Sequence, residues 1–131
     1  MDIEVELSRI IINETSDQQI IVLKERNGKR SFPIVIGMME AFAIDRRLKG
    51  LKPPRPMTHD LLDNVIKSLD AKIEKIVIND LRNHTFYAKI CLIANGRTIE
   101  VDSRPSDAIA LGVASNTPIH VAQHVLDAAS Q

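Results

Sequence analysis

Two Asn-Gly pairs, Asn27-Gly28 and Asn95-Gly96, constrain the fold of this chain more than any other feature of its sequence. Asn-Gly is the favoured pair for a tight turn between two antiparallel strands. The first pair lies between Ile20–Leu23 and Ser31–Ile36, and both flanking segments are rich in β-branched residues. The second pair is followed by a segment in which apolar and polar residues alternate. We therefore predict two β-hairpins, one in each half of the chain.

The other segments give strands and helices in no regular alternation. Strands are predicted at residues 3–12, 72–80, 85–93 and 98–102, with a short extended piece at 118–121. Helices are predicted at residues 38–48, after an N-cap at Thr58, from Pro105 to about Ser115, and at the C-terminus. In the second helix a wide apolar stripe is formed by Leu61, Leu62, Val65, Ile66 and Leu69. Hairpins grouped around a few helices indicate an α+β fold.

Length and composition exclude several classes of protein. A chain of 131 residues with 44% apolar residues can bury the core of a single domain and is too apolar for intrinsic disorder. Cys91 is the single cysteine, which excludes an internal disulfide and a cysteine-based zinc site. No apolar stretch approaches the roughly 20 residues that cross a bilayer, and the N-terminus does not have the pattern of a signal peptide. We therefore expect a cytoplasmic protein with no membrane partner.

Charge is balanced overall but not along the chain. The formal net charge is zero, which argues against bulk attraction to nucleic acid. Residues 1–20 carry a net charge of −4, residues 21–56 carry +6 and residues 57–131 carry −2. Residues 46–56 contain no acid and five cations, which are Arg46, Arg47, Lys49, Lys52 and Arg55. This stretch is either a patch that faces an anion or a solvated helix end and loop.

Polar side chains gather first at the start of the second predicted helix, in the segment Arg55-Pro56-Met57-Thr58-His59-Asp60. With Thr58 as the N-cap, His59 and Asp60 lie in the first turn, where an acidic residue stabilises the helix dipole. The same dipole disfavours a protonated imidazole, which leaves His59 available as a base or a metal ligand. The alternative for both residues is an ordinary capping or solvent-exposed role.

A second polar group, Asp102-Ser103-Arg104-Pro105-Ser106-Asp107, lies at a strand-to-helix junction. Pro105 suits the first position of a helix, so Arg104 falls just before the helix and Asp107 at its third position. Two carboxylates, two hydroxyls and a guanidinium within six residues exceed what capping requires. Free backbone N–H groups at a helix start can also hold a phosphate. The alternative is a capped structural junction with an Arg–Asp pair.

Several of these segments together resemble the bifunctional nuclease domain family. The matching segments are Phe32–Gly37 with Glu40 and Ala41, Arg55–Leu62, Thr85–Ala88, Asp102–Leu111 and Pro118-Ile119. The resemblance extends from about residue 3 to residue 126 and its two central motifs are long and specific. It implies a single domain, 1–131, with a mixed, mostly antiparallel sheet and flanking helices, and often a homodimer. The resemblance also implies a C-terminal extension in plant members and many bacterial ones, and we expect this protein to lack it because the sequence ends at Gln131.

The resemblance also implies cleavage of both DNA and RNA. Phosphodiester hydrolysis needs an activated water and neutralisation of the phosphoryl oxygens, and a divalent metal held by carboxylates commonly supplies both. The expected catalytic residues are His59 as general base, Asp60, Asp102 and Asp107, with Asp102 and Asp107 as ligands of Mg²⁺ or Mn²⁺. The expected substrate-binding residues are Arg55 and Arg104 at the phosphate, with Ser103, Ser106, Arg46, Arg47, Lys49 and Lys52.

Two hypotheses follow. The first is a nuclease of low specificity, because aromatic residues make up only 3% of the chain and no base-reading motif is present. Its binding of nucleic acid is expected to be local and weak. The second is a non-catalytic binding or regulatory module, dimeric, in which the Arg, Asp and His residues form a structural junction.

Overall fold

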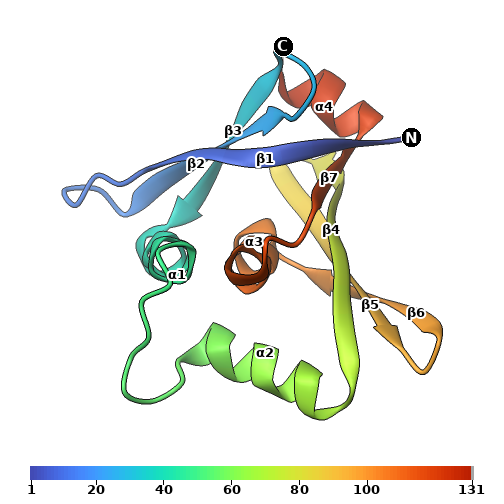
Figure 1. Ribbon diagram of the computed structural model, residues 1–131. Helices are drawn as coiled ribbons and strands as arrows, with labels where there is room; N and C mark the ends of the chain where they lie inside the picture. Colours follow the sequence, from blue (N-terminus) through green and yellow to red (C-terminus); the bar gives the residue numbers. More distant parts are fainter. Residues whose placement is uncertain (131) are drawn as a thin grey trace.

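The computed structural model describes residues 1–130, which fold into one seven-stranded sheet with four α-helices (Figure 1). The strands are β1 (Asp2–Ile11), β2 (Gln18–Glu25), β3 (Ser31–Gly37), β4 (Ala71–Arg82), β5 (Thr85–Ala94), β6 (Arg97–Ser103) and β7 (Ile119–Ala122). The helices are α1 (Met38–Leu48), α2 (Thr58–Ser68), α3 (Pro105–Gly112) and α4 (Gln123–Ala129), with a 3₁₀ turn, η1 (Val113–Ser115), after α3.

The sheet is mixed and mostly antiparallel, as the family resemblance implies. Its strand order is β3-β2-β1-β7-β4-β5-β6. Only the pairing of β4 with β7 is parallel, and it joins an N-terminal group of strands to the β4–β5–β6 meander. The α+β fold class is confirmed, and the short strand β7 is the element that makes one sheet out of two hairpin systems.

Both predicted hairpins form, but their turns differ. Asn95 and Gly96 have φ angles of 52° and 74°, as a tight two-residue turn requires. Asn27 and Gly28 do not have positive φ angles, and the Glu25 N–H donates to the Arg30 carbonyl across a longer loop at 2.9 Å. The tight turn predicted at Asn27-Gly28 was therefore wrong, whereas the hairpin around it is confirmed.

Helix α3 lies at the centre of the molecule. It runs beside α1, with β1 on one side of the pair and α2 on the other (Figure 1). Seven of its eight residues are buried, and small residues such as Ala108, Ala110 and Gly112 let neighbouring elements approach it closely. The helix predicted to continue to about Ser115 ends earlier, because the last turn tightens into η1. Helix α4 packs against β3, β4 and β7.

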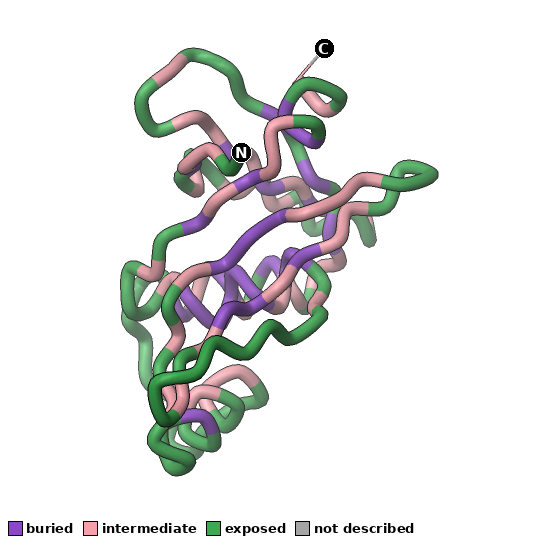
Figure 2. The backbone as a smooth tube through the Cα atoms, turned by 90° about the vertical axis from the view of Figure 1, so that its right-hand side faces the viewer, coloured by how far each residue is buried: buried purple, intermediate pink, exposed green. Residues whose placement is uncertain are grey.

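Two elements remain largely open to solvent. Strand β6, at the edge of the sheet, is exposed along most of its length (Figure 2). Ile66 is the only buried residue of α2, and Leu61, Val65 and Leu69 are 57%, 45% and 72% exposed. The apolar stripe of α2 is therefore present but is mostly uncovered in the single chain. No helix within residues 1–130 has the length and apolar character needed to cross a membrane.

Candidate functional site

Three helices begin around one hollow of about 500 Å³. The first turns of α1 and α2 and the junction before α3 each contribute side chains to its wall. These side chains include Met39, Glu40, Thr58, His59, Arg104 and Asp107. N–H groups in a first helical turn have no partner within the helix, so a hollow that three helix starts line is suited to anions.

A hydrogen-bonded chain of three residues forms the centre of this region. Asp107 Oδ1 lies 3.0 Å from His59 Nε2, and Arg104 Nε donates to Asp107 Oδ2 at 2.9 Å. The His59 side chain is 14% exposed and the Arg104 side chain is 65% exposed. The two segments singled out in the sequence, 48 positions apart at His59 and Asp107, are thus in direct contact. Arg104 is the N-cap of α3 and Asp107 its third residue, as predicted.

The hydrogen-bond partners of Asp107 favour its ionised form. Burial by itself would raise the pKa of this carboxyl, but the hydrogen bonds from Arg104 and His59 outweigh it and lower the pKa below its ordinary value. The same pair raises the pKa of Arg104. A carboxylate accepts hydrogen bonds and does not donate them, so it favours the His59 tautomer that carries its proton on Nε2. The other ring nitrogen, Nδ1, is then free to accept a proton.

Glu40 belongs to the same cluster, although the sequence analysis gave it no role at the site. Its Oε2 lies 3.6 Å from Arg104 Nη2, and its side chain is 24% exposed. The carboxylate folds back over Gly37, where a Cβ atom would collide with Glu40 Oε1. The sequence signal was an acidic residue in the first turn of α1 directly after a glycine. That signal is ordinary for a helix start, so only the tertiary contact with Arg104 identifies the role.

Asp102 and Ser103 lie on the other side of His59. They line a hollow of about 630 Å³ between α2 and the β5–β6 hairpin, together with His59, Arg104 and Asp107. The Ser103 hydroxyl donates to the Arg104 carbonyl at 2.8 Å. Asp102 is exposed and forms no ion pair with any residue in the range 1–130. The structure thus gathers five predicted site residues, in addition to His59, around two adjoining hollows: Arg46, Asp102, Ser103, Arg104 and Asp107.

Asp60 faces away from this cluster. Thr58 is the first helical residue of α2, so the predicted N-cap at Thr58 was wrong and Met57 takes that position. The Met57 N–H donates to Asp60 Oδ2 at 2.9 Å, while Arg46 Nη1 lies 3.2 Å from the same oxygen and Arg47 bonds to Oδ1. Burial acts to raise the pKa of Asp60, but these three donors together lower it. Asp60 therefore caps α2 and pairs with α1.

The basic stretch does not form one continuous free surface. Arg47 is buried, with 6% of its side chain exposed, and Arg46 is paired with Asp60. Lys49 is 61% exposed and lies 3.0 Å from the Asp45 carboxylate. Lys52 and Arg55 are in the exposed loop between α1 and α2. Of the predicted cations, Arg46 and Arg104 line the hollow at the three helix starts.

Ser106 and Cys91 are both buried and line neither of these two hollows. Ser106 is buried, with 5% exposure, at the start of α3. Cys91 is 2% exposed within β5, and its burial raises the pKa of the thiol, so it remains protonated and unreactive.

The side chains near His59 offer few ligands to a metal ion. In the described part of the chain, no three His, Cys, Asp or Glu side chains come close enough together to hold a metal ion. Both oxygens of Asp107 already bond to His59 and Arg104, while the carboxylate of Asp102 is exposed. The chain thus offers one or two carboxylates here. That number suits Mg²⁺ when water and substrate phosphates complete its coordination.

Comparison with known proteins identifies the family. Residues 21–131 match the bifunctional nuclease domain, a range that contains both segments of the site. An uncharacterized protein of Mycobacterium tuberculosis is 39% identical over 123 residues, which cover 94% of this chain and 73% of that protein. Bifunctional nucleases 1 and 2 of Oryza sativa subsp. japonica are 22% and 26% identical over 87% and 84% of this chain, which spans 36% and 35% of their lengths. The chain therefore belongs to the bifunctional nuclease domain family.

Proposed function

We propose that this protein is a nuclease of low sequence specificity that hydrolyses phosphodiester bonds of DNA, RNA or both at the His59–Asp107–Arg104 cluster. The observation that carries the proposal is the meeting of three helix starts around a histidine oriented by a carboxylate and an exposed arginine. Membership of a family with relatives named bifunctional nuclease supports it. Its partner is a nucleic acid bound locally, and its place of action is the cytoplasm.

The residues of the chain divide the chemistry between them. Asp107 holds the His59 ring through Nε2 at 3.0 Å, so Nδ1 is the atom that takes a proton from the attacking water. Arg104 uses Nε for Asp107 and, being 65% exposed, turns other N–H donors towards solvent. Those donors bind the phosphoryl oxygens, where negative charge increases in the transition state. Arg46, at the edge of the same hollow, adds positive charge for the neighbouring phosphate.

A divalent cation is part of the proposal. Glu40, Asp102 and Asp107 place three carboxylates around His59 against the single exposed guanidinium of Arg104. An anionic backbone that approaches this excess of negative charge is stabilised by a cation between the two. Asp102, with Asp107, would hold Mg²⁺ or Mn²⁺, which when bound neutralises charge on the phosphoryl oxygens.

The experiment compares His59→Ala with His124→Ala on labelled single-stranded DNA, double-stranded DNA and RNA. Loss of the base is expected to lower the cleavage rate by about 10²- to 10⁴-fold. His124 is a matched control, because it lies on α4 and faces Asp80 at 3.4 Å, away from the cluster. Equal cleavage by the two variants would reject this site.

The metal is tested separately on the same preparation. Cleavage is expected to stop in excess EDTA and to return with Mg²⁺ or Mn²⁺, and Asp102→Asn should raise the concentration of metal needed for half-maximal rate. Full activity in EDTA would show that cleavage needs no divalent metal. The nuclease assignment would then depend on the comparison of His59→Ala with His124→Ala.

A second candidate function rests on α2. Leu61, Val65 and Leu69 are exposed apolar side chains on one helix, which is typical of a surface that a partner covers. In this alternative the protein is a dimeric, non-catalytic binding or regulatory module, and the Arg, Asp and His residues tie helix starts together. It predicts a homodimer by sedimentation that Leu61→Asp disrupts, no cleavage of any substrate, and a lower Tm on removal of Arg104. Cleavage that depends on His59 would contradict it.

A further inference from the structure

Arg47, in the last turn of α1, is the one charged residue in the range 1–130 that is buried. Its guanidinium binds the end of another helix. Nε donates to the Ala110 carbonyl at 2.6 Å and Nη2 donates to the Leu111 carbonyl at 3.2 Å. Both carbonyls belong to the last turn of α3, where helix carbonyls have no partner within the helix. Arg47 thus holds the C-terminal end of α3 against α1.

The same guanidinium also holds the start of α2. Nη1 bonds to Asp60 Oδ1, and the other oxygen of Asp60 accepts the N–H of Met57, the N-cap of α2. Nη2 lies 3.8 Å from an Asp63 carboxylate oxygen one turn further along α2. One planar group therefore connects three helices, at the end of α1, the end of α3 and the start of α2.

We propose that Arg47 is a positioning residue for His59 rather than a contact for the substrate. His59 directly precedes Asp60 in the first turn of α2, and Asp107 lies on α3. The 3.0 Å contact between His59 Nε2 and Asp107 Oδ1 spans the two helices that Arg47 holds together. A shift of α2 relative to α3 would lengthen this contact and turn the imidazole away from its working orientation.

Arginine suits this position for a physical reason. A planar guanidinium has five donors in fixed directions, so it can serve two carbonyls and a carboxylate at once. A lysine ammonium carries the same charge but cannot reach the Ala110 carbonyl, the Leu111 carbonyl and Asp60 together. Because the charge is buried, Arg47 is tolerated only while all these partners are in place.

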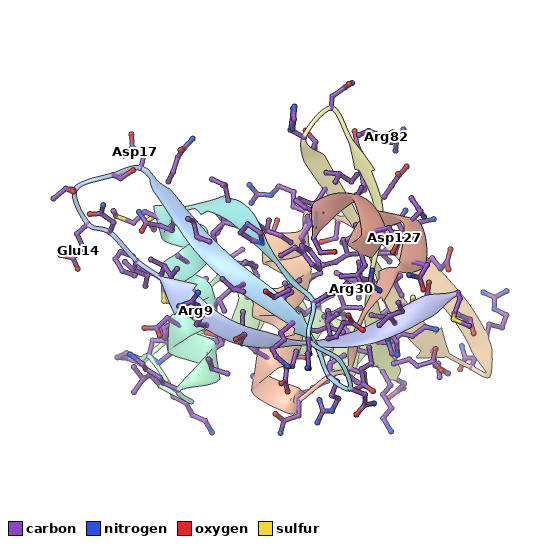
Figure 3. All side chains as sticks on the ribbon, turned by 90° about the horizontal axis from the view of Figure 1, so that it is seen from above. Arg9, Glu14, Asp17, Arg30, Arg82 and Asp127 are labelled. Carbon is purple, nitrogen blue, oxygen red and sulfur yellow. The ribbon has the colours of Figure 1, made fainter. Side chains whose placement is uncertain are left out.

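The test is Arg47→Lys, compared with Arg30→Lys. Arg30 also bridges elements far apart in sequence, since its guanidinium lies 2.8 Å from both Glu25 on β2 and Asp127 on α4. Arg30 and Asp127 are labelled in Figure 3. Both variants should lower Tm. Only Arg47→Lys should change the ¹⁵N and ¹H signals of the His59 ring in NMR spectra, and only it should lower kcat, by about tenfold, with KM unchanged.

A double variant separates positioning from mere loss of stability. If Arg47 acts through His59, Arg47→Lys causes no further loss of kcat in a His59→Ala background, although it still lowers Tm. An undiminished loss of kcat in that background overturns the inference, as does a rise in KM with kcat unchanged. If Arg47→Lys does not fold, Asp60→Asn takes its place, because an amide still accepts the Met57 N–H but weakens the bond to Arg47.

The kinetic readouts rest on the proposed nuclease function, but the NMR readout does not. A wild-type protein that cleaves no nucleic acid contradicts the proposed function and leaves the His59 ring signals to decide the role of Arg47. Ring signals that are the same in the wild type and in Arg47→Lys overturn that role, whatever the activity.

Discussion

Asp107 is the residue on which the site depends most directly, because each of its oxygens has a different partner. Oδ1 meets His59 and Oδ2 accepts from Arg104, so a single carboxylate orients the candidate base and the candidate phosphate ligand together. Arg104 is in turn shared with Glu40, 3.6 Å away. Hydrogen bonds and ion pairs among these four side chains fix their orientation. Enzymes commonly fix the geometry of polar residues near solvent in this way.

The lowered pKa of Asp107 predicts a pH-dependent contribution to stability. A carboxyl whose pKa is lower in the folded than in the unfolded state binds fewer protons when folded, so its contribution is full above the unfolded pKa of about 3.8. This contribution is lost as pH falls through the folded pKa. Wild-type Tm should therefore fall more steeply than the Tm of Asp107→Asn below about pH 4.

The measurement is calorimetry between about pH 2.5 and 7, a range in which an aspartate of the unfolded chain titrates. At pH 7 we expect Asp107→Asn to lower Tm by a few degrees, since two hydrogen bonds to a charged group are weakened. Asp102→Asn is the control and should keep the wild-type slope, because Asp102 forms no ion pair within residues 1–130. Identical slopes for the wild type and Asp107→Asn would contradict the pKa argument.

At the scale of elements, the site consists of helix starts. The third residues of α1 and α3 and the second residue of α2 provide Glu40, Asp107 and His59. Side chains in a first helical turn are fixed by the backbone of that turn and lie near unpaired N–H groups. Small changes where a helix begins should therefore alter the site more than they alter stability.

Gly37, the N-cap of α1, provides the test of this idea. In Gly37→Ala the new Cβ meets only the mobile end of the Glu40 side chain, so the carboxylate moves away from its place beside Arg104. The φ angle of Gly37 is −77°, which alanine adopts without strain. We expect the free energy of unfolding to change by less than about 1 kcal/mol and the cleavage rate to fall about tenfold.

Gly28→Ala is the matched control for this variant. There the added Cβ meets the end of the Glu25 side chain, in the β2–β3 loop and away from the helix starts. Urea titrations and cleavage assays on both variants make the comparison. A cleavage rate that Gly37→Ala leaves at the wild-type value would show that the position of Glu40 does not matter for the reaction.

At the scale of the whole molecule, α3 joins the site to the sheet. It packs against α1, α2, β4 and β5, and its N-terminal end carries Arg104 and Asp107. The open surfaces lie elsewhere, on α2 and on the edge strand β6. The core and the site therefore share one buried helix. A substitution that disturbs the packing of α3 should lower the free energy of unfolding of the whole domain.

Gly112→Ala tests the fit of α3. A Cβ at this position would lie 2.6 Å from Ile76 Cδ1 and 3.0 Å from Thr117 Cβ. Ile76 is fully buried in β4, so it has little space to move. We expect a loss of about 1–3 kcal/mol in the free energy of unfolding, seen as a lower midpoint in urea. An unchanged midpoint would show that α3 packs more loosely than these distances indicate.

Local patterns were enough to locate most elements. Helix α1 has its predicted bounds, and the strand-to-helix junction has Arg104 and Pro105 in the expected positions. The predictions were wrong where the same short segment can adopt more than one local conformation of similar energy. Asn27-Gly28 suits a tight turn but lies in a longer loop, and Thr58 suits an N-cap but is already helical, because the Asp60 carboxylate caps Met57 instead.

The sequence by itself determined the elements, the family and the two polar segments, because periodicity, turn residues and motifs depend on neighbours in the chain. Only the tertiary structure decided which side chains meet. It brought His59 to Asp107, added Glu40, buried Arg47 and left the apolar stripe of α2 uncovered. These outcomes depend on how α1 and α2 pack against α3, and contacts between residues far apart in sequence leave no local pattern.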